Sequence, residues 1–226
     1  MLLTAGGNSV NDYAFIKGMN AYREKDWATF ETVSCSDVET AAMLLSCCKN
    51  VAPKEVLCKI ALYHYIHHGD YFPIIRKYVR MALPYRSKDW RDNLPESVRE
   101  LKTFVVYRAG NEPIEKAKYS ISWTLLPDVA EWFAARHEHY HPDEKRHLYR
   151  ATISADKVIA YINERYEFEI VQYRNVKNIE EIPSTGVSQE FMNIHEQERN
   201  SSRVYEPHCD PKELYFNQWY RSKSDK

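Results

Sequence analysis

The segment Tyr166–Tyr173, YEFEIVQY, carries two carboxylates at alternate positions of a sequence that otherwise favours a buried β-strand. Side chains two residues apart point to the same side of a strand, so we expect Glu167 and Glu169 to project together. Such a pair lies either on a solvated sheet face or in a site where carboxylates handle protons and stabilise positive charge. The choice between these readings depends on what other strands bring to the same place.

Two earlier predicted strands also carry polar side chains. Arg108 follows the apolar residues of TFVVY, and Ser120, Ser122 and Thr124 alternate in YSISWTLL. Taken alone, either pattern is also what a solvated sheet face shows. Their order is more informative: an arginine strand comes first, then a Ser-x-Ser/Thr strand with a helix after it, and later a Glu-x-Glu strand.

This order of motifs resembles the Arg-Ser-Glu class of ADP-ribosyltransferases. The resemblance covers residues 104–173, and SWTLLPDVAEWFA is similar to the family's Ser-Thr-Ser strand and following helix. Trp123 departs from the pattern, because the family has threonine there. Ser120 offers a second alignment of the motif serine, whereas Ser122 keeps the family-like distance to the helix.

The resemblance implies an α+β fold with a split antiparallel sheet, and an enzyme that cleaves the nicotinamide–ribose bond of NAD and transfers ADP-ribose. Glu169 would stabilise the oxocarbenium-like transition state, and Glu167 would orient or deprotonate the acceptor. Arg108 would clamp the diphosphate, and Ser122 would hold the carboxylate and ribose in register. The residues expected to contact NAD are Tyr107, Arg108, Ala109, Gly110, Ser122 and Thr124.

The acceptor is less defined by the sequence. Tyr166, just before Glu167, either stacks on an acceptor ring or packs at the sheet edge. The basic and aromatic segment 74–91 either binds a nucleic-acid backbone or forms a solvated helix face. The acceptor is therefore expected to be a macromolecule, RNA, DNA or protein, and family resemblance suggests a toxin or antiviral effector with an antitoxin protein as partner.

Composition sets outer limits. The chain has 226 residues, of which 44% are hydrophobic, and 31 basic residues nearly balance 32 acidic ones, so no global field favours nucleic acid. Its five cysteines show no CxxC spacing, which fits a reducing compartment. No apolar run is long enough to span a bilayer. We expect a cytoplasmic protein without a membrane partner.

Histidines gather in two places, YHYIHH and RHEHYHPDEKRH. His64 and His68 have helical spacing for a metal, but a helix C-terminus explains them without one. His137, His139 and His141 belong to a charged, proline-containing stretch that reads as a loop. The sequence therefore predicts no metal site.

Residues 1–93 read as helices, including EVLCKIALYHYIHH after Pro53 and a helix beginning at Pro73. Residues 94–226 read as a catalytic domain of antiparallel strands, with one long helix beginning at Pro127 and a polar C-terminal extension from about Asn178. Two other functions remain open beside transfer. The same site could hydrolyse NAD, or the fold could be a binding module without catalysis.

Overall fold

The computed structural model describes residues 12–68, 72–144, 146–163 and 167–193. The chain forms two compact units that divide between Tyr85 and Arg86. We predicted the boundary after Asn93. In the structure, residues 86–93 belong to the second unit.

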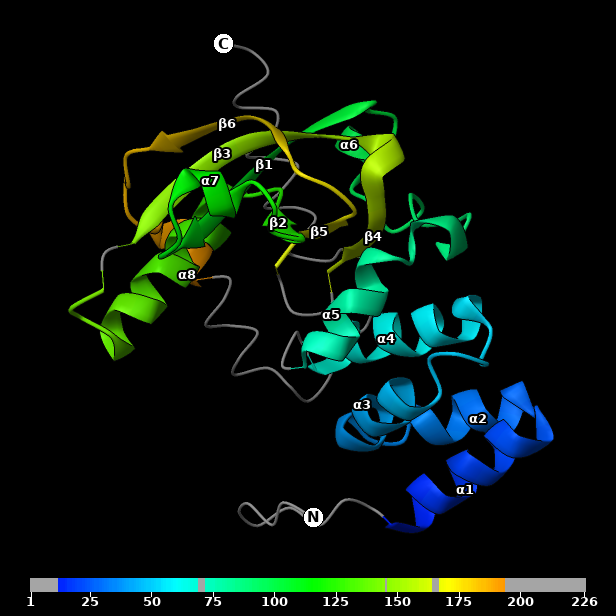
Figure 1. Ribbon diagram of the computed structural model, residues 1–226. Helices are drawn as coiled ribbons and strands as arrows, with labels where there is room; N and C mark the ends of the chain where they lie inside the picture. The colour runs from blue at the N-terminus through cyan, green and yellow to red at the C-terminus, as the bar shows by residue number, and fades with distance from the viewer. Residues whose placement is uncertain (1–11, 69–71, 145, 164–166, 194–226) are drawn as a thin grey trace. The chain divides into compact units, whose positions relative to one another are not determined.

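The first unit is helical in its described part (Figure 1). Phe30, Leu44, Leu57 and Ile60 are fully buried and form its core. The buried His64 ring places Nε2 2.8 Å from the carbonyl oxygen of Ser34, which joins two helices. The helices of this unit are α1 (Asp12–Glu24), α2 (Trp27–Ser34), α3 (Val38–Cys47), α4 (Lys54–His68), α5 (Pro73–Arg80) and the 3-10 turn η1 (Leu83–Tyr85).

The second unit combines a six-stranded antiparallel sheet with helices. Its strands are β1 (Thr103–Gly110), β2 (Ser122–Thr124), β3 (His147–Ser154), β4 (Val158–Ile162), β5 (Glu169–Gln172) and β6 (Lys177–Ile182). Its helices are α6 (Glu96–Arg99), α7 (Ile114–Ala117), α8 (Pro127–Tyr140) and the 3-10 turn η2 (Ala155–Lys157). The α+β prediction is confirmed at this level.

The strand order is β4-β5-β2-β1-β3-β6, and the sheet is narrowest at its centre. β1 pairs with β3 along its whole length, whereas β1 and β2 share one residue pair, Tyr107 with Thr124. The strands on either side of this pair therefore form two halves, β4-β5-β2 and β1-β3-β6. Helix α8 packs against β1, β2 and β3 (Figure 1).

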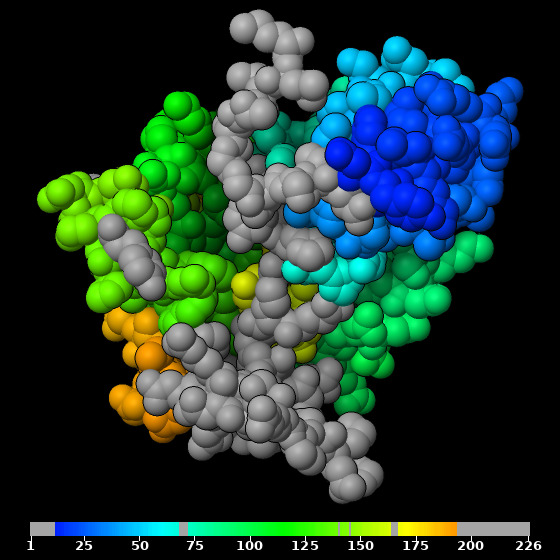
Figure 2. All heavy atoms as spheres, turned by 90° about the horizontal axis from the view of Figure 1, so that it is seen from below, coloured from blue at the N-terminus to red at the C-terminus, as the bar shows by residue number. Residues whose placement is uncertain are grey.

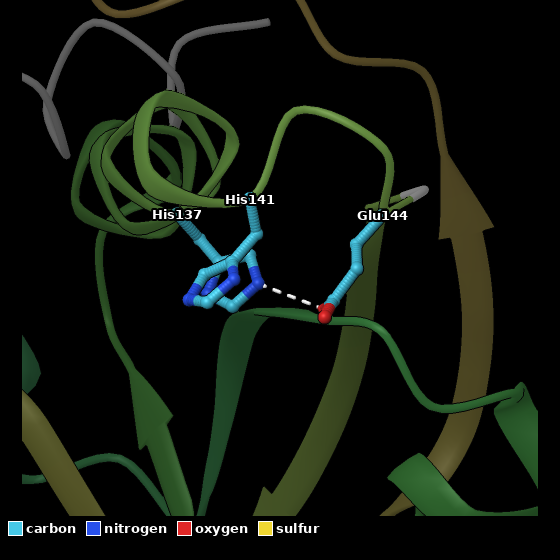
Figure 3. A group of neighbouring side chains, drawn as sticks. All are labelled: His137, His141 and Glu144. Atoms are coloured by element: carbon cyan, nitrogen blue, oxygen red, sulfur yellow. Dashed lines mark hydrogen bonds and ion pairs between the residues drawn. The ribbon is translucent and has the colours of Figure 1, made fainter.

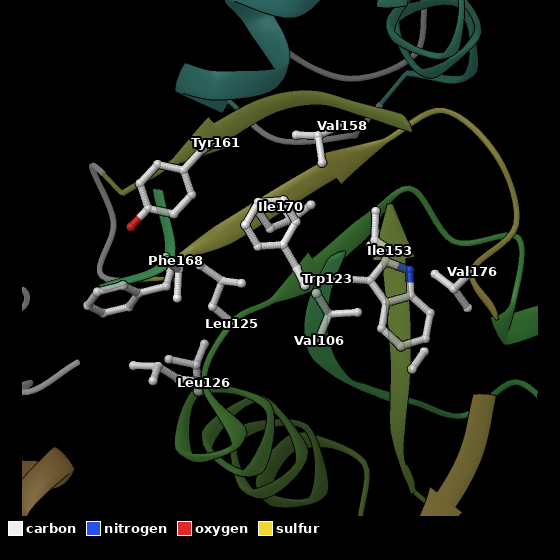
Figure 4. Close-up of a cluster of buried hydrophobic side chains, with 14 of the residues drawn as sticks. Val106, Trp123, Leu125, Leu126, Ile153, Val158, Tyr161, Phe168, Ile170 and Val176 are labelled. Carbon is white, nitrogen blue, oxygen red and sulfur yellow. The ribbon is translucent and has the colours of Figure 1, made fainter. Parts of the chain in front are cut away.

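The hydrophobic core of the second unit brings together side chains of β1 to β5 and of the segment that enters α8 (Figure 4). Trp123, Phe168 and Ile170 are each at most 1% exposed, and Leu125 and Leu126 join them from the segment that enters α8. Trp123 donates its indole N–H to the carbonyl oxygen of Ser120 at 2.9 Å. The residue that departs from the family pattern is thus a core residue here.

The basic and aromatic segment is largely occupied by structural contacts where it enters the second unit. Trp90 is buried, and the guanidinium groups of Arg86 and Arg91 lie 5.2 and 4.9 Å from its ring centre. Arg86 donates hydrogen bonds to the carbonyl oxygens of Ala155 and Val158. These three side chains support the fold, and binding of a nucleic acid by the segment stays a prediction.

The end of the described chain is bound to α8. β6 was not predicted, because its side chains are polar and mostly exposed; it pairs with β3 at the sheet edge. Beyond it, Ser184 and Thr185 donate hydrogen bonds to the carboxylate of Glu131, which is 4% exposed. Figure 2 shows this orange segment beside the lime-green residues of α8.

Two further predictions concern location. Among the helices that the structure describes, none combines the length and apolarity needed to cross a bilayer. The described cysteines, Cys35, Cys47, Cys48 and Cys58, are free thiols, and burial raises the pKa of Cys35, Cys48 and Cys58 to about 11. These three are therefore protonated at neutral pH.

Glu131→Gln tests the attachment of residues 184–185 to α8. The amide would place an N–H group against donors that now meet a buried carboxylate, so we expect a loss of about 1–3 kcal/mol in the free energy of unfolding. Glu138→Gln, at an exposed position of the same helix, should change it by less than about 0.5 kcal/mol. Equal stability of the two variants in urea unfolding would contradict this role of Glu131.

Candidate active site

Three polar side chains form a row across the narrow centre of the sheet. Tyr107 of β1 pairs with Thr124 of β2, and Thr124 pairs with Glu169 of β5. Directly paired residues point to the same face, with Cβ atoms about 4.5–5.5 Å apart. The register thus gathers a phenol, a hydroxyl and a carboxylate from three strands, and Glu169 is only 4% exposed.

Glu167 and Glu169 line the same cavity, but not through the strand alternation that the sequence predicted. β5 begins at Glu169, so Glu167 precedes the strand. Phe168 between them has a φ of 45°, in the left-handed region that bulky residues avoid. This residue turns the backbone and buries its own ring while both carboxylates remain at the cavity.

Thr124 holds this turn in place. Its hydroxyl donates to the carbonyl oxygen of Glu167 at 2.6 Å and accepts the backbone N–H of Leu126 at 3.1 Å. The backbone N–H of Leu125 donates to the carbonyl oxygen of Phe168 at 3.0 Å. Thr124 was predicted to contact NAD; it lines the cavity, but its hydroxyl serves to position Glu167 and the start of α8.

Arg108 is oriented by the neighbouring strand and by an acidic residue that the sequence analysis missed. Its Nη1 donates to the carbonyl oxygen of Ser122 at 3.1 Å, while Nε and Nη2 donate to Glu112 at 3.2 and 3.1 Å. Ser120 Oγ donates to the same Glu112 oxygen at 3.2 Å. These contacts use three of the five guanidinium N–H groups, so the predicted clamp on a diphosphate would have two others.

The charge of Glu112 is stabilised by these contacts. Burial by itself would raise the pKa of its carboxyl, but the charge of Arg108 and the hydrogen bonds from Arg108 and Ser120 lower it overall. Tyr107 shifts in the other direction, because burial raises the pKa of its phenol against the opposing charge of Arg150. At neutral pH the site therefore holds an ionised Glu112 and a protonated Tyr107.

The cavity has a volume of about 430 Å³, within the range of small-molecule sites. One wall is the strand row, and the other is a stripe of α8 whose members are three or four residues apart and so share a helix face. The lining residues are Tyr107, Arg108, Ala109, Ser122, Trp123, Thr124, Ala130, Phe133, Arg136, His137, His141, Arg146, Glu167 and Glu169.

Charge of both signs lines the cavity. Arg108, Arg136 and Arg146 contribute guanidinium groups, and Glu167 and Glu169 contribute carboxylates. The pKa of Arg146 is lowered overall: burial and the nearby charge of Arg108 lower it, and the charge of Glu112 opposes them. The buried Nε of Arg146 has no hydrogen-bond partner among the described residues.

The predicted site residues have different outcomes. Ser122 lines the cavity whereas Ser120 is bonded to Glu112, so the structure distinguishes the two serines. Gly110 is not among the described residues that line the cavity. A Cβ atom at this position would lie 2.3 Å from a carboxylate oxygen of Glu112. The small size of Gly110 leaves room for the Glu112 carboxylate, and its contact with NAD stays a prediction. Tyr166 lies outside the described residues.

The lining residues Arg136, His137, His141 and Arg146 were not predicted as part of the site. The histidine-rich stretch was read as a loop, although the helix predicted from Pro127 already included His137; α8 ends at Tyr140, so His137 belongs to its last turn and His141 caps it. The helical spacing of Ala130, Phe133, His137 and His141 was the available signal.

Comparison of the chain with protein-family models, with curated proteins and with solved structures finds no match.

The network around Glu112 predicts a dependence of stability on acid pH. Because the folded-state pKa of Glu112 lies below its ordinary value of 4.5, its stabilising contribution is present above about pH 4.5 and lost as pH falls through the folded pKa. The difference in unfolding free energy between wild type and Glu112→Gln should shrink as pH is lowered through this window. Urea unfolding at stepped pH measures it, with Glu115→Gln, at an exposed position of α7, as a control that should keep the wild-type profile. A constant difference would mean that the Glu112 charge is not stabilised by folding.

Proposed function

We propose that the protein is an NAD-dependent mono-ADP-ribosyltransferase that uses this cavity. One observation carries the proposal: a single cavity is lined by Arg108 of β1, by Ser122 of β2 and by Glu167 and Glu169 at the start of β5, in the order of the Arg-Ser-Glu class. The cavity also carries the charges that NAD requires. Its carboxylates complement a nicotinamide ring and ribose that bear positive charge, and its guanidinium groups complement a diphosphate.

Glu169 is the group that acts on NAD. Cleavage of the nicotinamide–ribose bond develops positive charge on the ribose, as in glycoside hydrolysis. A carboxylate that is 4% exposed and fixed at the start of β5 interacts with that charge without the screening of bulk water. Ser122, two residues before Thr124 on the same face of β2, holds the ribose in register.

Arg108 and Arg146 bind the diphosphate. Arg108 is already oriented by Glu112 and by the Ser122 carbonyl, so little side-chain freedom remains to be lost on binding. Arg146 supplies a donor that has no described partner in the protein. Tyr107, kept protonated by burial, offers a hydroxyl in the same row.

Glu167 acts on the acceptor. It precedes β5 and is less buried than Glu169, so an approaching macromolecule meets it first. Its carboxylate accepts the proton of the attacking group or orients it, while the ribose carbon forms the new bond and nicotinamide leaves.

Glu169→Gln tests the reaction centre. The amide keeps the size of the side chain but removes the charge that opposes the oxocarbenium-like state, so transfer should fall by about 100-fold or more. NAD binding, followed by calorimetry, should change little. Glu138→Gln, exposed on α8 and absent from the lining, is the control for substitution itself. Wild-type turnover in Glu169→Gln would refute the assignment.

Glu167→Gln separates acceptor activation from NAD cleavage. Acceptor labelling from radiolabelled NAD in cell lysate should fall by about 100-fold, whereas slow nicotinamide release to water should persist. Parallel digestion with protease and nucleases identifies the class of acceptor. Free ADP-ribose without labelled macromolecule in the wild type would indicate an NAD glycohydrolase, and no NAD binding at millimolar concentration would indicate a binding module.

A further inference from the structure

Three side chains that could coordinate a metal ion meet at the C-terminal end of α8 (Figure 3). His137 lies in the last helical turn, His141 follows the helix, and Glu144 comes from the loop that leads to β3. One ligand atom of each lies within 4.8 Å of the others. His137 Nε2 is 3.0 Å from Glu144 Oε2, and the two imidazole rings stack with centres 4.4 Å apart.

We propose that His137, His141 and Glu144 bind a borderline divalent cation, with Zn²⁺ as the best match to the ligand set. Histidines four residues apart at a helix end reach the same point, and imidazole nitrogen with carboxylate oxygen is a common zinc donor set. At zinc–ligand distances of about 2.0–2.2 Å, tetrahedral ligand atoms lie about 3.3 Å apart. Small rotations of the exposed His141 and Glu144 side chains therefore suffice to close the site.

The surroundings of Glu144 support a built site. Asn111, which directly follows β1, donates its side-chain N–H to Glu144 Oε2 at 3.0 Å. A hydrogen bond to a ligating carboxylate fixes its orientation and is a regular feature of metal centres. The loop that carries Glu144 is thereby tied to the β1 end of the sheet before any metal binds.

The position of the site gives the cation a defined role. His137 and His141 both line the cavity, so a metal held by three protein ligands has its fourth position at the cavity rim. An anionic oxygen of a cavity ligand can occupy that position. Metal binding itself needs no NAD, so this inference stands or falls separately from the proposed transferase activity.

The sequence analysis predicted no metal here because the segment read as a loop. Because α8 extends to Tyr140, His137 in its last turn and His141 at its C-cap lie on the same side of the helix. The helix therefore fixes their position relative to each other.

Titration of the chelator-treated full chain tests the proposal. Zn²⁺ should bind by calorimetry at one equivalent per chain, and Co²⁺ should give the visible absorption of a low-coordinate site that Zn²⁺ displaces. His141→Ala should weaken this binding by about 10-fold or more, and Glu144→Gln should weaken it as well. Both residues are exposed, so folding, checked by circular dichroism, should be retained.

His139→Ala is the matched control, because it removes an exposed imidazole from the same helical turn but not from the cluster. It should bind Zn²⁺ like the wild type. The proposal is overturned if the wild type binds no metal at one equivalent, if His141→Ala binds as tightly as the wild type, or if His139→Ala loses as much affinity as His141→Ala.

Discussion

The candidate active site depends on how Phe168 is held in a backbone conformation that it would not adopt alone. A left-handed φ costs a bulky residue about 1–3 kcal/mol. Burial of a phenylalanine ring contributes about 1.5–3 kcal/mol, and the Phe168 ring is 1% exposed. Hydrogen bonds from Thr124 and Leu125 to the carbonyls of Glu167 and Phe168 hold the same turn. Core packing therefore determines where the two carboxylates lie.

This arrangement separates the groups that hold the site from the groups that face the cavity. Thr124, Glu112 and the Ser122 carbonyl form hydrogen bonds within the protein, whereas Glu167, Glu169 and Arg108 bring charge to the cavity. Electrostatic stabilisation of a transition state is effective when the charges are already oriented, because no reorganisation accompanies the reaction. The left-handed turn at Phe168 and the ion pair of Arg108 with Glu112 both fix the orientation of charged groups at the cavity.

The pattern of apolar and polar residues predicted those strands and helices of the second unit that bury apolar side chains. β1 begins at Thr103 and contains the predicted strand TFVVY with Arg108 after it, and Pro127 opens α8 as expected. β6 was missed because an edge strand is held by backbone pairing and by exposed ion pairs such as Arg150–Glu180, so its side chains show no alternation. The predicted strand at residues 166–173 was too long, because β5 covers only Glu169–Gln172. The turn before it has Phe168 at a positive φ, where glycine is the usual sequence signal.

The site was predictable in its members but less so in their roles, because roles depend on register. Nothing in the order of residues says that Thr124 lies opposite both Tyr107 and Glu169, yet this pairing makes it the centre of the row. The same limit explains Glu112 and Gly110: an acidic residue four positions after Arg108 gains meaning only when the chain turns back on itself after β1. The sequence motif identifies residues that line the cavity. The residues that hold these side chains in place can be recognised only once the strand pairing is known. The single pair between β1 and β2 joins Tyr107 to Thr124, and both residues line the cavity, so the cavity lies at the narrow junction of the sheet.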